Sequence, residues 1–168
     1  MASRWLCVGL TTVLGVRRCS FANGCPAVLA GDFNFKPHAG EACYQVMTTG
    51  KLEANHPDYP TPPDNEAWRP VLKQPWVSAY AAASEDGKTE PPFTNYVVMS
   101  EEEEFCDCID YVFVSPEVQT VAVDALPATR EDCGPMPNAR QPSDHLALGA
   151  NLMVPKVAKA SAGHGSKL

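Results

Sequence analysis

The sequence predicts a single domain of the α/β class, and three observations carry that prediction. Short runs of β-branched and aromatic residues, which are typical of strands, recur at 94–99, 109–114 and 118–123, and residues 146–152 predict a final strand. Residues 39–52 instead carry apolar and small residues at helical spacing. The length of 168 residues suits one hydrophobic core. Strands mixed with helices favour an α/β over an all-β architecture.

The expected elements begin with a strand at 26–31, a short apolar run that we expect to be buried on both faces of a sheet. The helix at 39–52 should end near Gly50. Six prolines between residues 55 and 75 then impose a long loop. A short helix is expected within 76–83, before the remaining strands.

Composition excludes several classes of protein. The longest apolar runs fall short of the ~18–20 residues that a membrane-spanning helix needs. The formal net charge is −7, and residues 1–31 hold three arginines and no acid, so the acidic character lies in the rest of the chain. An acidic surface repels long nucleic acid, which disfavours a protein that coats DNA without sequence preference. The four acids at 101–104 are interpreted as a solvated hairpin segment.

The two ends of the chain differ from its middle. Residues 1–24 form a segment of unclear status, either a presequence or an alternative start, and 25–154 form the domain. Residues 155–168 are a flexible tail ending in Ser166-Lys167-Leu168, the tripeptide read by the peroxisomal import receptor. We therefore expect a peroxisomal location, with the cytoplasm and mitochondria as alternatives.

Polar side chains that could do chemistry sit at the ends of the predicted strands. Asp32 and Asn34 follow the first strand, and alternation along a strand would place them on one face. Asp110 interrupts a run of residues of buried type, so its carboxylate needs a partner. Asp144 and His145 precede the last strand and offer a carboxylate for a hard cation and an imidazole for proton transfer.

Each of these segments also has a purely structural interpretation. The Gly-Asp-Phe-Asn stretch at 31–34 suits a turn, and Asp110 suits a structural ion pair. The Ser-Asp-His stretch at 143–145 suits the start of a helix. The combination of all three at strand ends in one chain favours the chemical interpretation.

Three motifs then resemble one superfamily, the endonuclease/exonuclease/phosphatase proteins, and most closely the branch of CCR4-type deadenylases, nocturnin and 2′-phosphodiesterase. The first is the strand with Gly-Asp-Phe-Asn at 26–37, the second comprises 93–96 and 105–115, and the third is 136–148, which contains Pro-Ser-Asp-His. The resemblance covers residues 25–153. It implies the C-terminal half of a four-layer fold, in which two β-sheets are stacked between helices.

The resemblance also implies a role for each polar residue. His145 is similar to the family's general base or transition-state donor, and Asp110 to the acid that orients it. Asp32 would position the attacking water, Asn34 would hold a phosphoryl oxygen, and Asp144 would lie beside magnesium. The implied reaction is hydrolysis of a phosphoester with Mg²⁺ as cofactor and Mn²⁺ as an alternative.

The implied substrate is RNA, at its 3′ end, or a small nucleotide. Phe105 matches an aromatic residue that stacks on a substrate base, although a core phenylalanine is an equally good interpretation. Asn95, in the Phe-Thr-Asn-Tyr motif, is expected to bind substrate together with Asn34.

The sequence departs from the family in one respect. Family members carry a magnesium-binding glutamate in the first half of the domain, and residues 1–31 contain no acid. Two functions therefore remain open. One is a metal-dependent phosphoester hydrolase, and the other is a truncated, inactive fragment or pseudoenzyme that serves as an interaction module.

Overall fold

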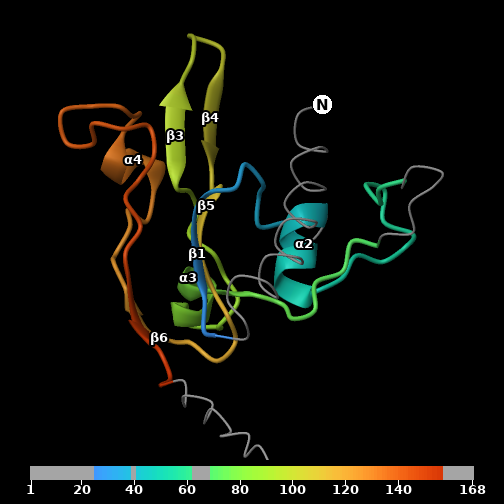
Figure 1. Cartoon of the computed structure of the whole chain (residues 1–168). Helices are drawn as coiled ribbons and strands as arrows, with labels where there is room; N and C mark the ends of the chain where they lie inside the picture. Colours follow the sequence, from blue (N-terminus) through green and yellow to red (C-terminus); the bar gives the residue numbers. More distant parts are fainter. Residues whose placement is uncertain (1–24, 39–40, 62–68, 157–168) are drawn as a thin grey trace, which may run out of the picture.

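The computed structural model in Figure 1 describes residues 25–38, 41–61 and 69–156. The N-terminal segment 1–24 and the tripeptide Ser166-Lys167-Leu168 lie outside these described residues. Within the described ranges, no helix has both the length and the apolar character required to cross a membrane. Helices and strands are mixed, so the predicted α/β class is confirmed.

A three-stranded antiparallel sheet forms the centre of the molecule, in the order β1 (Val28–Asp32), β5 (Asp110–Val114), β2 (Val77–Ser78). The register pairs Val28 with Val114 and Asp32 with Asp110. β1 and β5 lie far apart in sequence, so a long-range pairing brings the first two polar segments to the same end of the sheet.

Two further pairs of strands flank this sheet. β3 (Asn95–Val98) pairs with β4 (Glu104–Asp107), and β6 (Gln119–Val123) pairs with β7 (Ala150–Met153). The last strand was predicted to start at 146 but starts at Ala150. The reason is that the chain at 145–146 lies along β3 instead, where the Leu146 N–H donates to the Thr94 carbonyl at 2.7 Å.

The three helices of the described chain are short. α2 (Ala42–Thr49) ends at Gly50, whose positive φ of 84° suits a glycine, as the sequence predicted. α3 (Ala79–Ala83) is capped by the Ser78 hydroxyl, which accepts the Ala81 N–H. α4 (Arg130–Cys133) was not anticipated and is closed by a capping box at its start.

The two faces of the central sheet are packed differently. The back face, defined by Leu29, Ser78, Tyr111 and Phe113, lies against α2 (Figure 1). Its aromatic rings pack closely, with the Tyr111 and Phe113 centroids 5.0 Å apart. The front face, defined by Ala30, Asp32, Asp110 and Val112, faces α3 and the β6–β7 pair.

The prediction that the first strand is buried on both faces is wrong. Val28 is 49% exposed and Ala30 and Asp32 are also exposed, whereas Leu29 on the back face is half-buried. The cause is that α3 and the β6–β7 pair pack over Val112 of β5 and leave the neighbouring part of β1 uncovered. The acids 101–104 are exposed, as expected for a solvated hairpin.

Candidate active site

Two carboxylates share the front face at the end of the central sheet. Asp32 is the last residue of β1 and Asp110 the first of β5, and the register sets them directly opposite each other. Opposed residues of an antiparallel pair project to the same face, with Cβ atoms about 5 Å apart. The site is therefore built on a rigid strand pairing.

His145 reaches this pair from a different part of the chain. A single β-bridge joins His145 to Asn95 of β3, and the Leu146 N–H bond to Thr94 holds the next residue. This placement sets Nδ1 of His145 2.9 Å from Oδ2 of Asp110. Asp110 and His145, which stand 35 positions apart in sequence, are thus within hydrogen-bond distance of each other.

Thr94 fixes the Asp110 carboxylate. Its hydroxyl donates to Oδ2 of Asp110 at 2.8 Å and accepts the N–H groups of Ile109 and Asp110 at 3.0 Å each. Thr94 is completely buried, so a rigid donor serves the same oxygen that faces His145. This threonine belongs to the Phe-Thr-Asn-Tyr motif, but no role was predicted for it. The need of Asp110 for a partner was the signal that could have identified it.

The carboxylates determine the protonation of His145. Burial acts to lower the pKa of His145, but the hydrogen bond and charge of Asp110, with the charges of Asp144 and Asp32, raise it above the ordinary value. Because the Nδ1 side faces Asp110, the Nε2 side is the one available to another group.

Asp32 and Asn34 are adjacent, but not for the predicted reason. The strand ends at Asp32, and Asn34 has a left-handed φ of 53°, so strand alternation does not apply to it. A tight turn brings the two together instead. The Asn34 backbone N–H donates to Oδ1 of Asp32 at 2.9 Å, and its side-chain amide donates to Oδ2 at 3.1 Å. One amide hydrogen of Asn34 remains available for another acceptor.

The remaining predicted site residues lie around this centre. Oδ2 of Asp144 is 4.0 Å from Nε2 of His145, and the side chain is about half exposed. Asn95 is 3% exposed, and its Oδ1 is buried without a hydrogen-bond partner within the described chain. Phe105 lies on β4, and the Lys36 ammonium is 5.2 Å from the centre of its ring. The assigned roles of these three residues remain predictions.

Lys36 was not among the predicted site residues, but it lies beside them. Its Nζ is 2.5 Å from Oδ2 of Asp107, two residues after Phe105 on β4. The lysine follows the turn that holds Asp32 and Asn34, so it ties this turn to β4. A cation over an aromatic ring is a favourable contact.

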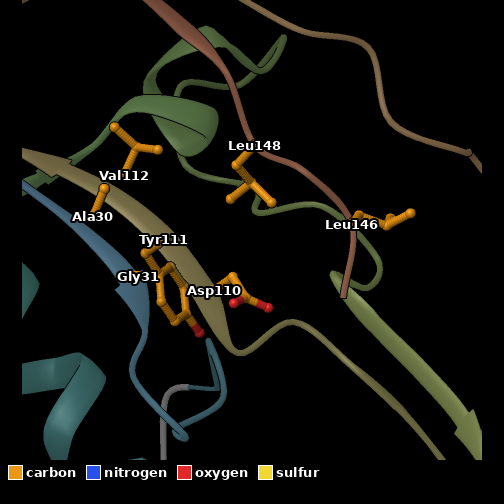
Figure 2. A pocket seen from close by; sticks show the side chains of 7 residues that line it. All are labelled: Ala30, Gly31, Asp110, Tyr111, Val112, Leu146 and Leu148. Atoms are coloured by element: carbon orange, nitrogen blue, oxygen red, sulfur yellow. The ribbon is translucent and has the colours of Figure 1, made fainter. Parts of the chain in front are cut away.

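A pocket of about 280 Å³ opens beside the Asp110 carboxylate (Figure 2). Leu146 and Leu148 line one side, and Ala30, Gly31 and Val112 line the other. Figure 2 shows the Asp110 carboxylate directed away from Tyr111 and toward the segment that carries Leu146. The small side chains of β1 create the space.

The described residues do not form a complete metal site. Asp32 and Asp144 offer the oxygen atoms that Mg²⁺ prefers, but no group of three His, Cys, Asp or Glu side chains converges among the described residues.

The fold and the site define an α/β protein with a carboxylate–imidazole pair at the end of its central sheet. The model of the endonuclease/exonuclease/phosphatase family matches residues 12–145, most of the chain, and the chain belongs to this family.

Curated relatives place the chain in the branch that its motifs resemble. It is 32% identical to nocturnin of Xenopus laevis over 73% of this chain and 26% of the relative. It is 33% identical to carbon catabolite repressor protein 4 homolog 4 of Arabidopsis thaliana, over 76% of this chain and 27% of the relative. It is 30% identical to 2′,5′-phosphodiesterase 12 of Mus musculus, over 77% of this chain and 20% of the relative. The chain thus spans about a fifth to a quarter of their lengths.

A solved structure has the same fold. ANGEL2, described as a 2′,3′-cyclic phosphatase in complex with adenosine-2′,3′-vanadate, superposes with a TM-score of 0.63 at 20% identity. The match covers 89% of this chain and 52% of ANGEL2. It confirms the endonuclease/exonuclease/phosphatase-like fold class.

Proposed function

We propose that this chain is a phosphoester hydrolase that acts on RNA 3′ ends or on small nucleotides, with water as the nucleophile. The observation that carries the proposal is the contact of 2.9 Å between Nδ1 of His145 and Oδ2 of Asp110. A carboxylate on one ring nitrogen orients the imidazole and stabilises its protonated form, as acid–base catalysis requires.

The site contains groups that can accept and donate the protons that this reaction requires. With Nδ1 of His145 held by Asp110, Nε2 either accepts a proton from water or, as imidazolium, donates to a phosphoryl oxygen. The raised pKa of His145 increases the share of the donating form near neutral pH. Asp32 accepts the proton of the attacking water, and the free amide hydrogen of Asn34 donates to the phosphoryl group. As the new O–P bond forms, the P–O bond to the leaving group breaks and the leaving oxygen takes a proton from solvent.

The names of the relatives support the substrate class. One is a 2′,5′-phosphodiesterase, and the structural neighbour is a 2′,3′-cyclic phosphatase with an adenosine-2′,3′-vanadate ligand. Both names concern phosphoesters at nucleotide 2′ or 3′ positions. Phe105 is the residue of this chain proposed to stack on the base, and Asn95 is proposed to contact the substrate.

Family enzymes are generally dependent on divalent metal ions, and we propose Mg²⁺ for this chain, with Mn²⁺ as the alternative. The ion would neutralise charge on the phosphoryl oxygens. Asp144 is the residue proposed to lie beside it, because its carboxylate is about half exposed and next to His145.

The test measures product release from an adenylate oligomer and from a 2′,5′-linked dinucleotide, with Mg²⁺ and with EDTA. His145→Ala should lower the rate at least ~10²-fold, the usual effect of removing an acid–base group. His56→Ala is the matched control, because His56 is not part of the candidate site and its Nδ1 accepts the Asp58 N–H. Equal rates in wild type and His145→Ala would overturn the proposal.

A second function is favoured by the exposed front of β1. Val28, Ala30 and Asp32 are open to solvent there, which suits an interaction module that binds another protein and catalyses nothing. Failure of the folded chain to hydrolyse either substrate at any Mg²⁺ concentration would support this alternative.

A further inference from the structure

An ion pair joins α4 to β4, and each of these two elements also carries a cysteine. Glu104 and Cys106 are two residues apart on β4 and therefore project to the same face. Arg130 and Cys133 are three residues apart on α4 and therefore lie on the same side of the helix. Nη1 of Arg130 is 2.5 Å from Oε1 of Glu104. This ion pair joins the side of α4 that carries Cys133 to the face of β4 that carries Cys106.

The two thiols share one environment. Both are free and half-buried, and both pack against the same hydrophobic cluster of Phe93, Tyr96, Met136 and Leu146. Burial raises the pKa of Cys106, the charge of Arg130 lowers it, and the charges of Glu104, Asp107 and Cys133 raise it further. The electrostatic interaction between Cys106 and Cys133 agrees with the placement that the ion pair implies.

We propose that Cys106 and Cys133 are a redox-active pair that a peroxide converts into a disulfide joining β4 to α4. This modification site stands on the packing of two free thiols and does not depend on the proposed hydrolytic activity. An oxidised cysteine needs a second thiol nearby to form a disulfide instead of passing to irreversible acids, and this pair meets that condition.

The reaction is balanced with hydrogen peroxide as oxidant. The Cys133 thiolate attacks one peroxide oxygen, an S–O bond forms, the O–O bond breaks and water leaves after protonation. The Cys106 thiolate then attacks the sulfenic sulfur, the S–S bond forms, the S–O bond breaks and a second water leaves. Two electrons pass from the thiols to peroxide. The same balance holds if Cys106 is oxidised first and Cys133 attacks its sulfenic sulfur, although burial raises the pKa of Cys106 and leaves less of it as thiolate.

The disulfide would fasten the segment that leads to His145. After Cys133, the Asn138 amide donates to the Cys133 carbonyl at 3.2 Å, and the Met136 N–H donates to the Tyr96 carbonyl of β3 at 2.8 Å. These bonds already hold the segment to α4 and β3. A covalent link from Cys133 to β4 would add a third attachment and close a loop of the chain, which raises the temperature of unfolding.

The experiment treats the reduced full chain with increasing hydrogen peroxide at pH 8 and maps the peptides under non-reducing conditions by mass spectrometry. We expect a linked peptide containing Cys106 and Cys133, lighter by two hydrogen atoms. We also expect a rise of about 5 °C or more in the unfolding midpoint that dithiothreitol reverses. Cys133→Ser should abolish both results. Cys25→Ser, which removes an exposed thiol elsewhere, should leave both unchanged.

A further variant tests the geometric argument directly. Glu104→Gln removes the charge that holds Arg130, so the disulfide should form several-fold more slowly while both thiols remain. Sulfinic or sulfonic acids at Cys106 and Cys133 in the folded chain, or pairing of Cys106 with another cysteine, would overturn the proposal.

Discussion

The two faces of the central sheet use neighbouring residues of the same strand for opposite purposes. On the back face, Tyr111 and Phe113 are fully buried in an aromatic cluster. On the front face, Asp110 and Val112 line a pocket of about 280 Å³ beside His145. Alternation along β5 thus places Tyr111 and Phe113 in the aromatic core and turns Asp110 and Val112 to the other face, where Val112 is also buried.

The comparison shows that adjacent residues of β5 serve different purposes, because one stabilises the core and the next lines the pocket. Large rings fill the back face, and close packing there leaves no room for a ligand. On the front face, Ala30 is too small to fill the space before Leu146 and Leu148, and its neighbour Gly31 adds no side chain. Substitutions at adjacent positions of β5 should therefore give different phenotypes.

The largest expected effect is on the back face. Phe113→Ala should lower the free energy of unfolding by about 3–5 kcal/mol, because a completely buried ring leaves a cavity. Val112→Ala on the front face should cost clearly less. Urea unfolding followed by circular dichroism measures both changes. Equal losses of unfolding free energy would contradict the difference in packing between the two faces.

The second prediction tests whether the buried Thr94 hydroxyl holds Asp110 in place on the front face. Thr94→Val should lower the free energy of unfolding by about 1–3 kcal/mol, because it leaves the Ile109 and Asp110 N–H groups buried without their acceptor. Thr94→Ser retains the hydroxyl and should lose much less. If both variants unfold at the same urea concentration, the hydroxyl is not what holds Asp110.

A third prediction concerns the protonation of His145. Asp110→Asn should lower the pKa of His145, because the hydrogen bond and charge of Asp110 raise it, and NMR titration of the imidazole would measure the shift. Asp32→Asn should lower it less, since Asp32 contributes least among the three carboxylates.

The contact between Asp110 and His145 also makes the free energy of unfolding depend on pH. A raised pKa in the folded state gives stability that is complete below the ordinary value of 6.5 and is lost as pH rises through the folded value. The stability advantage of wild type over Asp110→Asn should therefore shrink as the pH rises above 6.5. An advantage that grows with pH would contradict the assignment.

The smallest effect comes from a carboxyl group on the back-face side. Glu90 is buried and accepts the hydroxyls of Tyr44 and Ser78 at 2.8 Å each. Burial raises its pKa against the lowering effect of these hydrogen bonds, so ionisation costs stability as the pH rises above the ordinary value of 4.5. Glu90→Gln should become progressively more stable relative to wild type between pH 5 and 8. A difference independent of pH in urea unfolding would show that Glu90 does not ionise there.

Local sequence signals predicted the parts of this molecule that depend on local chemistry. The strand at 109–114, the end of α2 at Gly50 and the polar residues at strand ends follow from alternation, glycine and charge. The exposed front of β1 depends on where the β6–β7 pair stops, and the Thr94 bond depends on the pairing of β3 with the His145 segment. Such contacts join distant segments, and a pattern within one segment does not encode them.

The pairing of β1 with β5 also has a consequence for the time course of folding. Next to that pairing, the Ala27 N–H bonds the Ser115 hydroxyl across 88 residues, whereas β3 and β4 are joined by a short hairpin. Closing the long loop costs chain entropy before any contact repays it, so the hairpin can form early and the β1–β5 ladder late. Asp32 meets Asp110 only in that late step. A ligand that binds between them would therefore slow unfolding and leave the folding rate almost unchanged.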